Sequence, residues 1–177
     1  MKRNFLILAL ASVTILSTNS CQKDDSGENS ELQKKAIQLE NYVVNNRFIP
    51  VDFYSDTPID YLETDAVVLA ETDLKKYIFD YLTDDIITFN PDKTLLVDQG
   101  DKRMEGTTAK TFTRSWNTET SKAKNLVYLV YLDYFYDQRR YTLVEWTDTS
   151  IIAYIDWTSK ADPTKTAKIY TRFQKKI

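Results

Sequence analysis

The chain has 177 residues, with 26 acidic and 23 basic side chains and a formal charge of −3. That length is enough for one ordinary domain with a hydrophobic core, and the mildly acidic balance without a basic tract argues against nucleic acid as a partner. The sequence has no histidine and one cysteine, which excludes an internal disulfide bridge and removes most ligands of zinc, copper and haem. We therefore expect neither a metal site nor a cofactor.

Residues 1–20 are typical of a leader peptide. Lys2 and Arg3 give it a positive start, and residues 5–16 form an apolar segment. That segment is shorter than the roughly 20 residues that a helix needs to span a bilayer. Removal of the leader would take two of the 23 basic residues away and move the net charge from −3 to −5.

The stretch STNSC, residues 17–21, resembles a bacterial lipobox, with Ser20 directly before Cys21, although Thr18 stands where leucine is usual. The resemblance implies acyl chains on Cys21 that anchor the protein in a membrane, since each buried methylene contributes about 0.8 kcal/mol. An ordinary signal peptide cut near Cys21, leaving a free thiol, is the alternative.

Lys23, Asp24 and Asp25 follow the cysteine at once. A lysine followed by acidic residues at this place resembles the surface-export signal of lipoproteins of the Bacteroidota. It implies a lipid-anchored protein of the outer membrane that is exposed at the cell surface. The same residues would also serve as a solvated linker, and we expect residues 21–30 to form a flexible tether.

Residues 31–46 are predicted to form an amphipathic helix. Ser30 and Gln33 make a capping box, and the Asn45-Asn46 pair predicts the end of the helix. Apolar residues recur at helical spacing at Leu32, Ala36, Leu39 and Val43. We expect this stripe to cover the outer face of the strand at residues 125–136, which is apolar on both faces.

Residues 47–177 are predicted to form a mainly β domain. Segments rich in β-branched and aromatic residues alternate with turn sequences such as NPDK at Asn90 and DQGD at Asp98. Short connections favour an antiparallel meander. A short capped helix is predicted at residues 72–82, between the first two strands. The predicted strands are 48–54, 85–90, 94–98, 107–116, 125–136, 140–146, 150–157 and 166–175.

The stretch DDIITFNPDKTLLVDQG, residues 84–100, resembles the second hairpin of the lipocalin-like lipoproteins of the Bacteroidota. Trp116 in TRSWNTE, residues 141–155 (YTLVEWTDTSIIAYI) and residues 169–176 (IYTRFQKK) are similar to later strands of that family, in the expected order. The chain departs from the family at Lys93, where glycine is favoured. The resemblance implies an antiparallel lipocalin-like barrel of about eight strands with an interior pocket, and it supplies no catalytic residues.

Few groups could carry catalysis. Asp84 and Asp85 are neighbours on a strand, so they point to opposite faces and cannot act on one bond together. Asp98 and Asp101 are typical of solvated turn carboxylates. A catalytic triad lacks its histidine, and a chain with three glycines has no phosphate-binding loop. We therefore expect that the protein is not an enzyme.

Aromatic side chains are the remaining candidates for a functional site, with 12 Tyr, 8 Phe and 3 Trp. If these side chains line an interior pocket, they would bind a small apolar or mixed ligand. The alternative is that they pair across strands and fill the hydrophobic core. Asp133 lies on an otherwise apolar face and needs a partner, for which Arg114 and Arg172 are candidates. The predicted lining of a ligand pocket is Tyr131, Asp133, Trp146, Tyr154 and Trp157.

A second hypothesis is a structural or interaction lipoprotein, accessory to an outer-membrane complex, whose tyrosine-rich face meets another protein. A filled barrel interior would favour this hypothesis. An open cavity of a few hundred cubic ångströms, lined by aromatic side chains and one or two carboxylates, would favour ligand binding.

Overall fold

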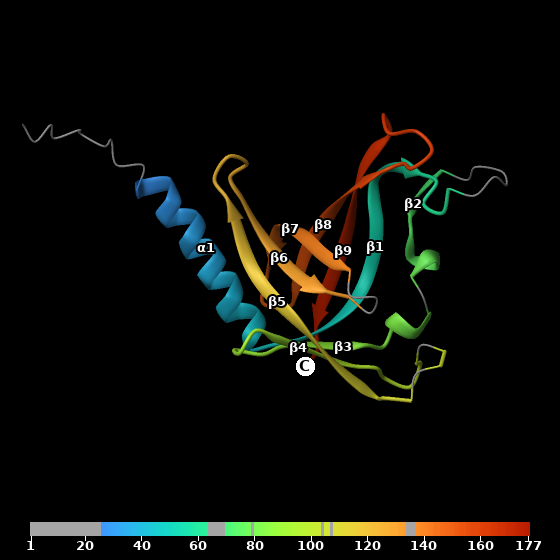
Figure 1. Ribbon diagram of the computed structural model, residues 1–177, viewed down its shortest axis with the longest axis horizontal. Helices are drawn as coiled ribbons and strands as arrows, with labels where there is room; N and C mark the ends of the chain where they lie inside the picture. Colours follow the sequence, from blue (N-terminus) through green and yellow to red (C-terminus); the bar gives the residue numbers. More distant parts are fainter. Residues whose placement is uncertain (1–25, 64–69, 79, 104, 107, 134–136) are drawn as a thin grey trace, which may run out of the picture.

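The β-branched and aromatic segments form one antiparallel sheet that closes into a barrel (Figure 1). The computed structural model describes residues 26–63, 70–78, 80–103, 105–106, 108–133 and 137–177. Within these residues the sheet has nine strands in the order β2-β1-β3-β4-β5-β6-β7-β8-β9, and β1 also pairs with β9. Eight strands therefore make the closed barrel, and β2 is an extra strand. The strands are β1 (Arg47–Ile59), β2 (Glu71–Asp73), β3 (Ile86–Phe89), β4 (Thr94–Asp98), β5 (Thr111–Ser121), β6 (Leu126–Leu132), β7 (Gln138–Trp146), β8 (Ser150–Thr158) and β9 (Thr166–Lys175).

The predicted mainly β, antiparallel barrel of about eight strands is confirmed. Strands β4 and β9 have the bounds that the alternation predicted, with buried and more exposed residues in turn. Strand β5 runs past Trp116 to Ser121, because these last residues pair in register with the apolar strand β6. Strand β6 ends at Leu132, and the last residues of the predicted strand, 134–136, lie outside the described part of the chain.

Strand β1 has three partners, and this arrangement shapes one side of the barrel. It pairs with β9 from Phe48 to Ser55, but with β3 only at Arg47 and Phe48. Further along, β1 pairs with β2 instead. The described chain between β2 and β3 therefore lies on the side where β1 and β3 separate (Figure 1).

Two short 3₁₀ turns, η1 (Lys75–Tyr77) and η2 (Asp80–Leu82), stand where the sequence predicted a single short helix. Ile78 ends η1 with an extended backbone, at φ −69° and ψ 124°. Leu74, just before η1, is completely buried, and its backbone N–H donates to the carbonyl oxygen of Phe53 in β1 at 3.0 Å. Burial of Leu74 against the barrel and its hydrogen bond to β1 fix the chain at this point. The segment therefore does not form one regular helix.

The structure has one α-helix within the described residues, α1 (Ser26–Val44). Its buried residues Leu32, Ala36, Leu39 and Val43 belong to the same apolar cluster as the inward-facing side chains of β5 and β6. Glu40 accepts a hydrogen bond from Thr118 Oγ1 at 3.2 Å and pairs with Lys93 at 2.6 Å. The helix therefore covers one end of the barrel, not the outer face of β6. On the outer face of β6, the Arg140 guanidinium lies 4.2 Å from the Tyr128 ring.

Candidate functional site

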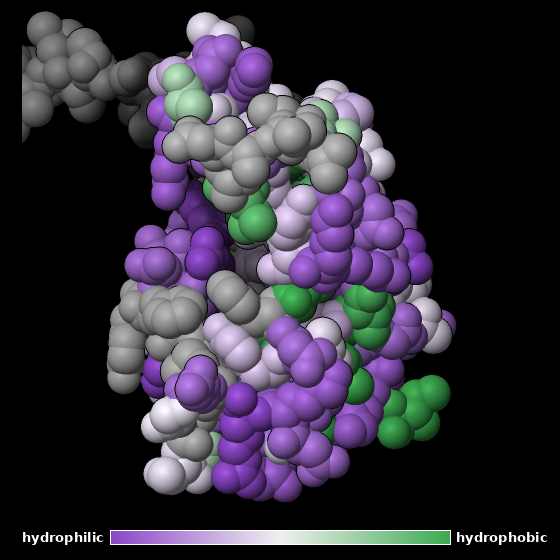
Figure 2. Space-filling model, turned by 90° about the vertical axis from the view of Figure 1, so that its right-hand side faces the viewer, coloured by the Kyte–Doolittle hydropathy of each residue, from purple (hydrophilic) through white to green (hydrophobic). Residues whose placement is uncertain are grey.

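A cavity of about 210 Å³ lies in the barrel interior, on the side opposite α1. Figure 2 views the molecule from the β2 side and shows a recess near the middle of this face, with hydrophobic residues exposed beside it. The lining is mainly aromatic and aliphatic, and its polar members are five tyrosines, Thr171, two carboxylates and one guanidinium. The lining residues are Pro50, Phe53, Tyr61, Tyr77, Ile78, Tyr81, Leu82, Asp85, Ile87, Leu95, Val97, Phe112, Tyr131, Leu132, Asp133, Arg139, Tyr141, Ile155, Thr171 and Phe173.

An ion pair between Asp133 and Arg139 forms one polar part of the lining. Arg139 Nε and Nη2 both lie 2.7 Å from Asp133 Oδ2. The backbone N–H of Asp137 donates to the other carboxylate oxygen at 3.0 Å. The Asp133 side chain is 15% exposed and that of Arg139 is 41% exposed. The carboxylate is therefore the more buried partner of the ion pair.

This pairing differs from the one expected for Asp133. Arg114 donates from Nε to the main-chain oxygen of Asp133 at 3.0 Å. Arg172 lies 4.0 Å from Asp52. The β6–β7 register brings Arg139 to the carboxylate, because Tyr131 and Leu132, next to Asp133, pair with Arg139 and Gln138.

Two tyrosines stack on the inner wall beside the ion pair. The rings of Tyr131 and Tyr141 lie 5.5 Å apart and 16° from parallel. Burial raises the pKa of Tyr131 well above its ordinary value, and a hydrogen bond with Tyr141 acts in the same direction. The pKa of Arg139 is also raised, because its hydrogen bond and charge interaction with Asp133 outweigh the opposing effect of burial. Both groups therefore keep their protons at physiological pH.

The second carboxylate, Asp85, sits at the start of β3 and is only 2% exposed. Tyr81, from η2, lies on the same side of the cavity. Burial raises the pKa of Tyr81, and the negative charges of Asp85 and Asp133 raise it further. The electrostatic potential at the Tyr81 hydroxyl is therefore influenced by both carboxylates.

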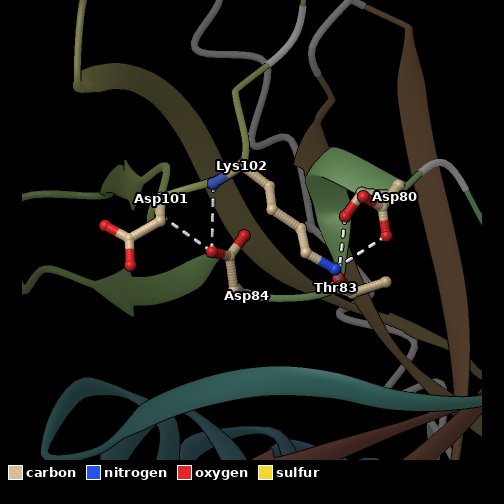
Figure 3. Close-up of polar contacts among 5 residues, drawn as sticks. All are labelled: Asp80, Thr83, Asp84, Asp101 and Lys102. Carbon is tan, nitrogen blue, oxygen red and sulfur yellow. Dashed lines mark hydrogen bonds and ion pairs between the residues drawn. The ribbon is translucent and has the colours of Figure 1, made fainter.

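A small polar network holds η2 at the rim of the cavity (Figure 3). Asp84 Oδ2 accepts the backbone N–H groups of Asp101 at 2.8 Å and of Lys102 at 3.2 Å. The Lys102 ammonium group reaches η2, at 2.7 Å from Asp80 Oδ1 and 3.4 Å from Thr83 Oγ1. The loop after β4 and the turn that carries Tyr81 are thereby tied together, which gives Asp84 a positional role.

The structure brings two of the five predicted lining residues to the cavity, Tyr131 and Asp133. Trp146 packs against the main apolar cluster, and Trp157 packs against the smaller cluster of Ile59, Leu74, Ala167 and Ile169. Tyr154 lies on the outer face of β8, with its ring centre 5.5 Å from that of Tyr170 and 4.7 Å from Lys168 Nζ. Neighbouring strand residues face opposite sides of a sheet, so Tyr154 turns outward where Ile155 turns inward.

Sequence reasoning missed Asp85, Arg139, Tyr81 and Tyr141 as members of the lining. Arg139 lies between the predicted strands 125–136 and 140–146, and only the register of β6 against β7 places it beside Asp133. The strand alternation does contain the signal for Tyr141, which shares a face with Leu143. Cys21, Lys23, Asp24 and Asp25 lie outside the described residues.

No protein-family model matches this chain, and no curated protein matches it. Across the described ranges, no group of three or more His, Cys, Asp or Glu side chains is arranged to hold a metal ion. In the same part of the chain, the helices are too short or too polar to cross a membrane. The cavity is therefore the feature of the described structure that bears most on function.

Proposed function

We propose that this protein is a membrane-anchored lipoprotein that binds a small apolar or mixed ligand inside a lipocalin-like barrel. The observation that carries the proposal is the cavity of about 210 Å³, whose wall combines aromatic side chains with two carboxylates. Ligand sites combine apolar walls with a few placed polar groups in this way. The structure supports binding through the barrel architecture, which closes strands around an interior.

The size of the cavity limits the ligand. Sites for drug-sized ligands measure roughly 300–1,000 Å³, and this cavity measures about 210 Å³. The ligand, or the part of it inside the barrel, is therefore small, such as one ring with a short chain. Its polar groups would meet tyrosine hydroxyls and the carboxylates of Asp85 and Asp133.

The anchor and the location are proposed from sequence. Acyl chains on Cys21 would hold the protein on the outer membrane, and Lys23, Asp24 and Asp25 would direct it to the cell surface. The family resemblance of residues 84–100 supports the lipocalin-like type of barrel. The resemblance supplies no catalytic residues, and we propose that the protein is not an enzyme.

A second candidate function is favoured by a specific feature of the outer surface. The rings of Tyr54 and Tyr170 stack at 5.1 Å, and Tyr154 continues the row on the neighbouring strand. A row of tyrosines across three adjacent strands is suited to contact with another protein. On this alternative the protein is a structural or interaction lipoprotein, accessory to an outer-membrane complex.

Native mass spectrometry of the protein released from its own membrane, with parallel extraction of small molecules, distinguishes the two functions. We expect a small molecule to remain bound, and a co-purifying polypeptide would instead select the interaction function. Val97→Phe adds bulk to a lining position of β4, so it should remove the small molecule. The control is Val144→Phe, the same change at an exposed position of β7.

The anchor has its own test. Cys21→Ala should release the protein from membranes, and continued membrane retention would contradict lipidation. Replacement of Lys23, Asp24 and Asp25 by alanine should keep the anchor and remove access to external protease. If external protease still cleaves this variant on intact cells, the export signal would be contradicted.

A further inference from the structure

The cavity wall carries hydrogen-bonding groups of two kinds: some already have partners in the protein, and others still have hydrogen bonds to offer. A ligand that enters a largely apolar wall loses water, so each of its polar groups needs a partner in the lining. On the premise that the cavity binds a ligand, the groups with remaining hydrogen bonds specify the polar chemistry of that ligand.

The two carboxylates of the lining have partners within the protein. Asp133 Oδ2 lies 2.7 Å from both Nε and Nη2 of Arg139, and Oδ1 accepts the backbone N–H of Asp137 at 3.0 Å. Asp85 also interacts with another part of the protein. A hydrogen-bond donor of the ligand would have to share these oxygens with the protein's own groups.

Arg139 keeps donors that its ion pair does not use. A guanidinium has only N–H donors and no acceptor. Within the described residues, the contacts of Arg139 with Asp133 involve Nε and Nη2, which leaves the N–H groups of Nη1 for another acceptor. Because the guanidinium is planar and is held at two nitrogens, the remaining N–H groups have a fixed direction.

Tyr61 brings a hydroxyl group to the same part of the wall. It follows β1, and the centre of its ring lies 5.5 Å from those of Phe53 and Tyr77. Burial raises the pKa of Tyr61, while the positive charge of Arg139 acts to lower it and Tyr141 acts to raise it. The phenol therefore lies within electrostatic reach of both. In the described part of the chain its hydroxyl has no hydrogen-bond partner.

The stacked rings of Tyr131 and Tyr141 contribute a third donor. Their hydroxyls share a hydrogen bond, in which one O–H donates and the other remains available. Tyr131 pairs with Arg139 across β6 and β7, so the two side chains share the inner face of the sheet. The phenols and the guanidinium thus gather on one part of the wall.

The wall toward the main core cluster is apolar. Ile87, Leu95, Val97 and Phe173 line the cavity and belong to the same cluster as the buried face of α1. A hydrocarbon ring would be buried against these side chains, with its polar group toward Arg139 and Tyr61.

We infer that the cavity selects a small uncharged molecule with a carbonyl-type oxygen, such as a ketone, ester or amide on one ring, and that this oxygen accepts hydrogen bonds from Arg139 and Tyr61. The inference rests on the proposed ligand-binding function and narrows it. A carboxylate is disfavoured at this place because Asp133 lies 2.7 Å from the guanidinium and would repel a second negative charge. The volume of about 210 Å³ leaves room for little beyond one ring and a short chain.

Isothermal titration calorimetry with three probes of similar size tests the inference on protein released from its own membrane and freed of bound small molecules. The probes are acetophenone, which has a carbonyl oxygen, ethylbenzene, which has no polar atom, and benzoate, which has a carboxylate. Acetophenone should bind about tenfold more tightly than ethylbenzene. Benzoate should bind more weakly than acetophenone.

Variants assign the effect to the two donors. Tyr61→Phe removes a hydroxyl and keeps the ring, so it should weaken acetophenone binding about threefold and leave ethylbenzene binding unchanged. The double variant Arg139→Leu with Asp133→Leu removes the ion pair as a unit and should bring the two affinities to within about threefold. The control, Tyr170→Phe, removes a hydroxyl on the outer face of β9 and should leave all affinities unchanged.

Infrared spectroscopy of acetophenone labelled with carbon-13 at its carbonyl gives a direct readout of the hydrogen bond. A hydrogen bond lowers the stretching frequency of a carbonyl group. The band of bound acetophenone should therefore lie at higher frequency in Tyr61→Phe than in the wild type, and it should not move in Tyr170→Phe. An unchanged band in Tyr61→Phe would overturn the inference that Tyr61 binds the oxygen.

The titrations separate the inference from the function beneath it. Equal binding of acetophenone and ethylbenzene would overturn the selection of a carbonyl oxygen and leave the cavity as a site for small apolar ligands. Tightest binding of benzoate would overturn the selection of an uncharged ligand and also leave the binding cavity in place. Failure of all three probes to bind would overturn the inference and count against the cavity as a ligand site.

Discussion

Gly100 lies against Asp84, and its replacement by alanine tests how the rim of the cavity is held. A Cβ atom at Gly100 would lie 2.4 Å from Asp84 Oδ2, 2.6 Å from its Cγ and 3.0 Å from its main-chain oxygen. Real Cβ contacts essentially never fall below 3.0 Å. The carboxylate would therefore have to leave its place, where it accepts the backbone N–H groups of Asp101 and Lys102.

The expected cost follows from these two hydrogen bonds. A hydrogen bond to a charged group contributes about 1.5–3 kcal/mol, and the exposure of Asp101 and Lys102 places both bonds at or below the low end. We expect Gly100→Ala to lower the free energy of unfolding by about 2–3 kcal/mol, the sum of the two bonds. In a chain of this size, the melting temperature falls by roughly 2–4 °C for each kcal/mol.

Chemical denaturation of four proteins measures the effect: the wild type, Gly100→Ala, Asp84→Ala and the double variant. If the clash with Asp84 is the cause, Gly100→Ala should cost far less once Asp84 is alanine, with a coupling energy of about 1–3 kcal/mol. The control is Gly106→Ala, because Gly106 has φ 82° and nothing within 4 Å of an added Cβ. That variant should pay only the backbone cost of about 1–2 kcal/mol. Equal costs of Gly100→Ala with and without Asp84 would refute the reasoning.

Three further predictions concern the core, the ion pair and alkaline pH. Trp116→Ala should cost about 3–5 kcal/mol in denaturant unfolding, because the buried ring packs against Phe89 and its Nε1 donates to the Asn90 carbonyl; a cost below about 1 kcal/mol would contradict this packing. Arg139→Leu alone should destabilise the protein more than the double variant Arg139→Leu with Asp133→Leu. The single change leaves the largely buried Asp133 carboxylate without the Arg139 guanidinium. The melting temperatures of the two variants measure this difference. The raised pKa of Tyr131 means that its phenol contributes full stability below pH about 10, where the unfolded chain is also protonated, and loses it as pH rises further. Tyr131→Phe should therefore make the fall in unfolding free energy above pH 10 less steep, and an unchanged slope in denaturation series between pH 9 and 12 would contradict the buried phenol.

The sequence by itself determined the class of fold. The strands could be predicted because successive residues of a strand face opposite sides of the sheet, a pattern that depends only on residues close together in the sequence. Segments 94–98 and 166–175 therefore appear in the structure with their predicted bounds. Turn residues such as Asn90 and Asp92 also act locally, since Asp92 Oδ1 accepts the backbone N–H of Thr94 at 3.0 Å.

The tertiary structure alone decided the cavity. Tyr131 and Asp133 were predicted from the pattern of aromatic and charged residues along one strand, but their partners Tyr141 and Arg139 depend on the register between β6 and β7. The sequence also did not indicate that the long strand β1 leaves β3 after two residues and pairs with β2. Register and barrel closure join residues that are distant along the chain, and a hydrophobic pattern specifies which face is buried without specifying which partner buries it.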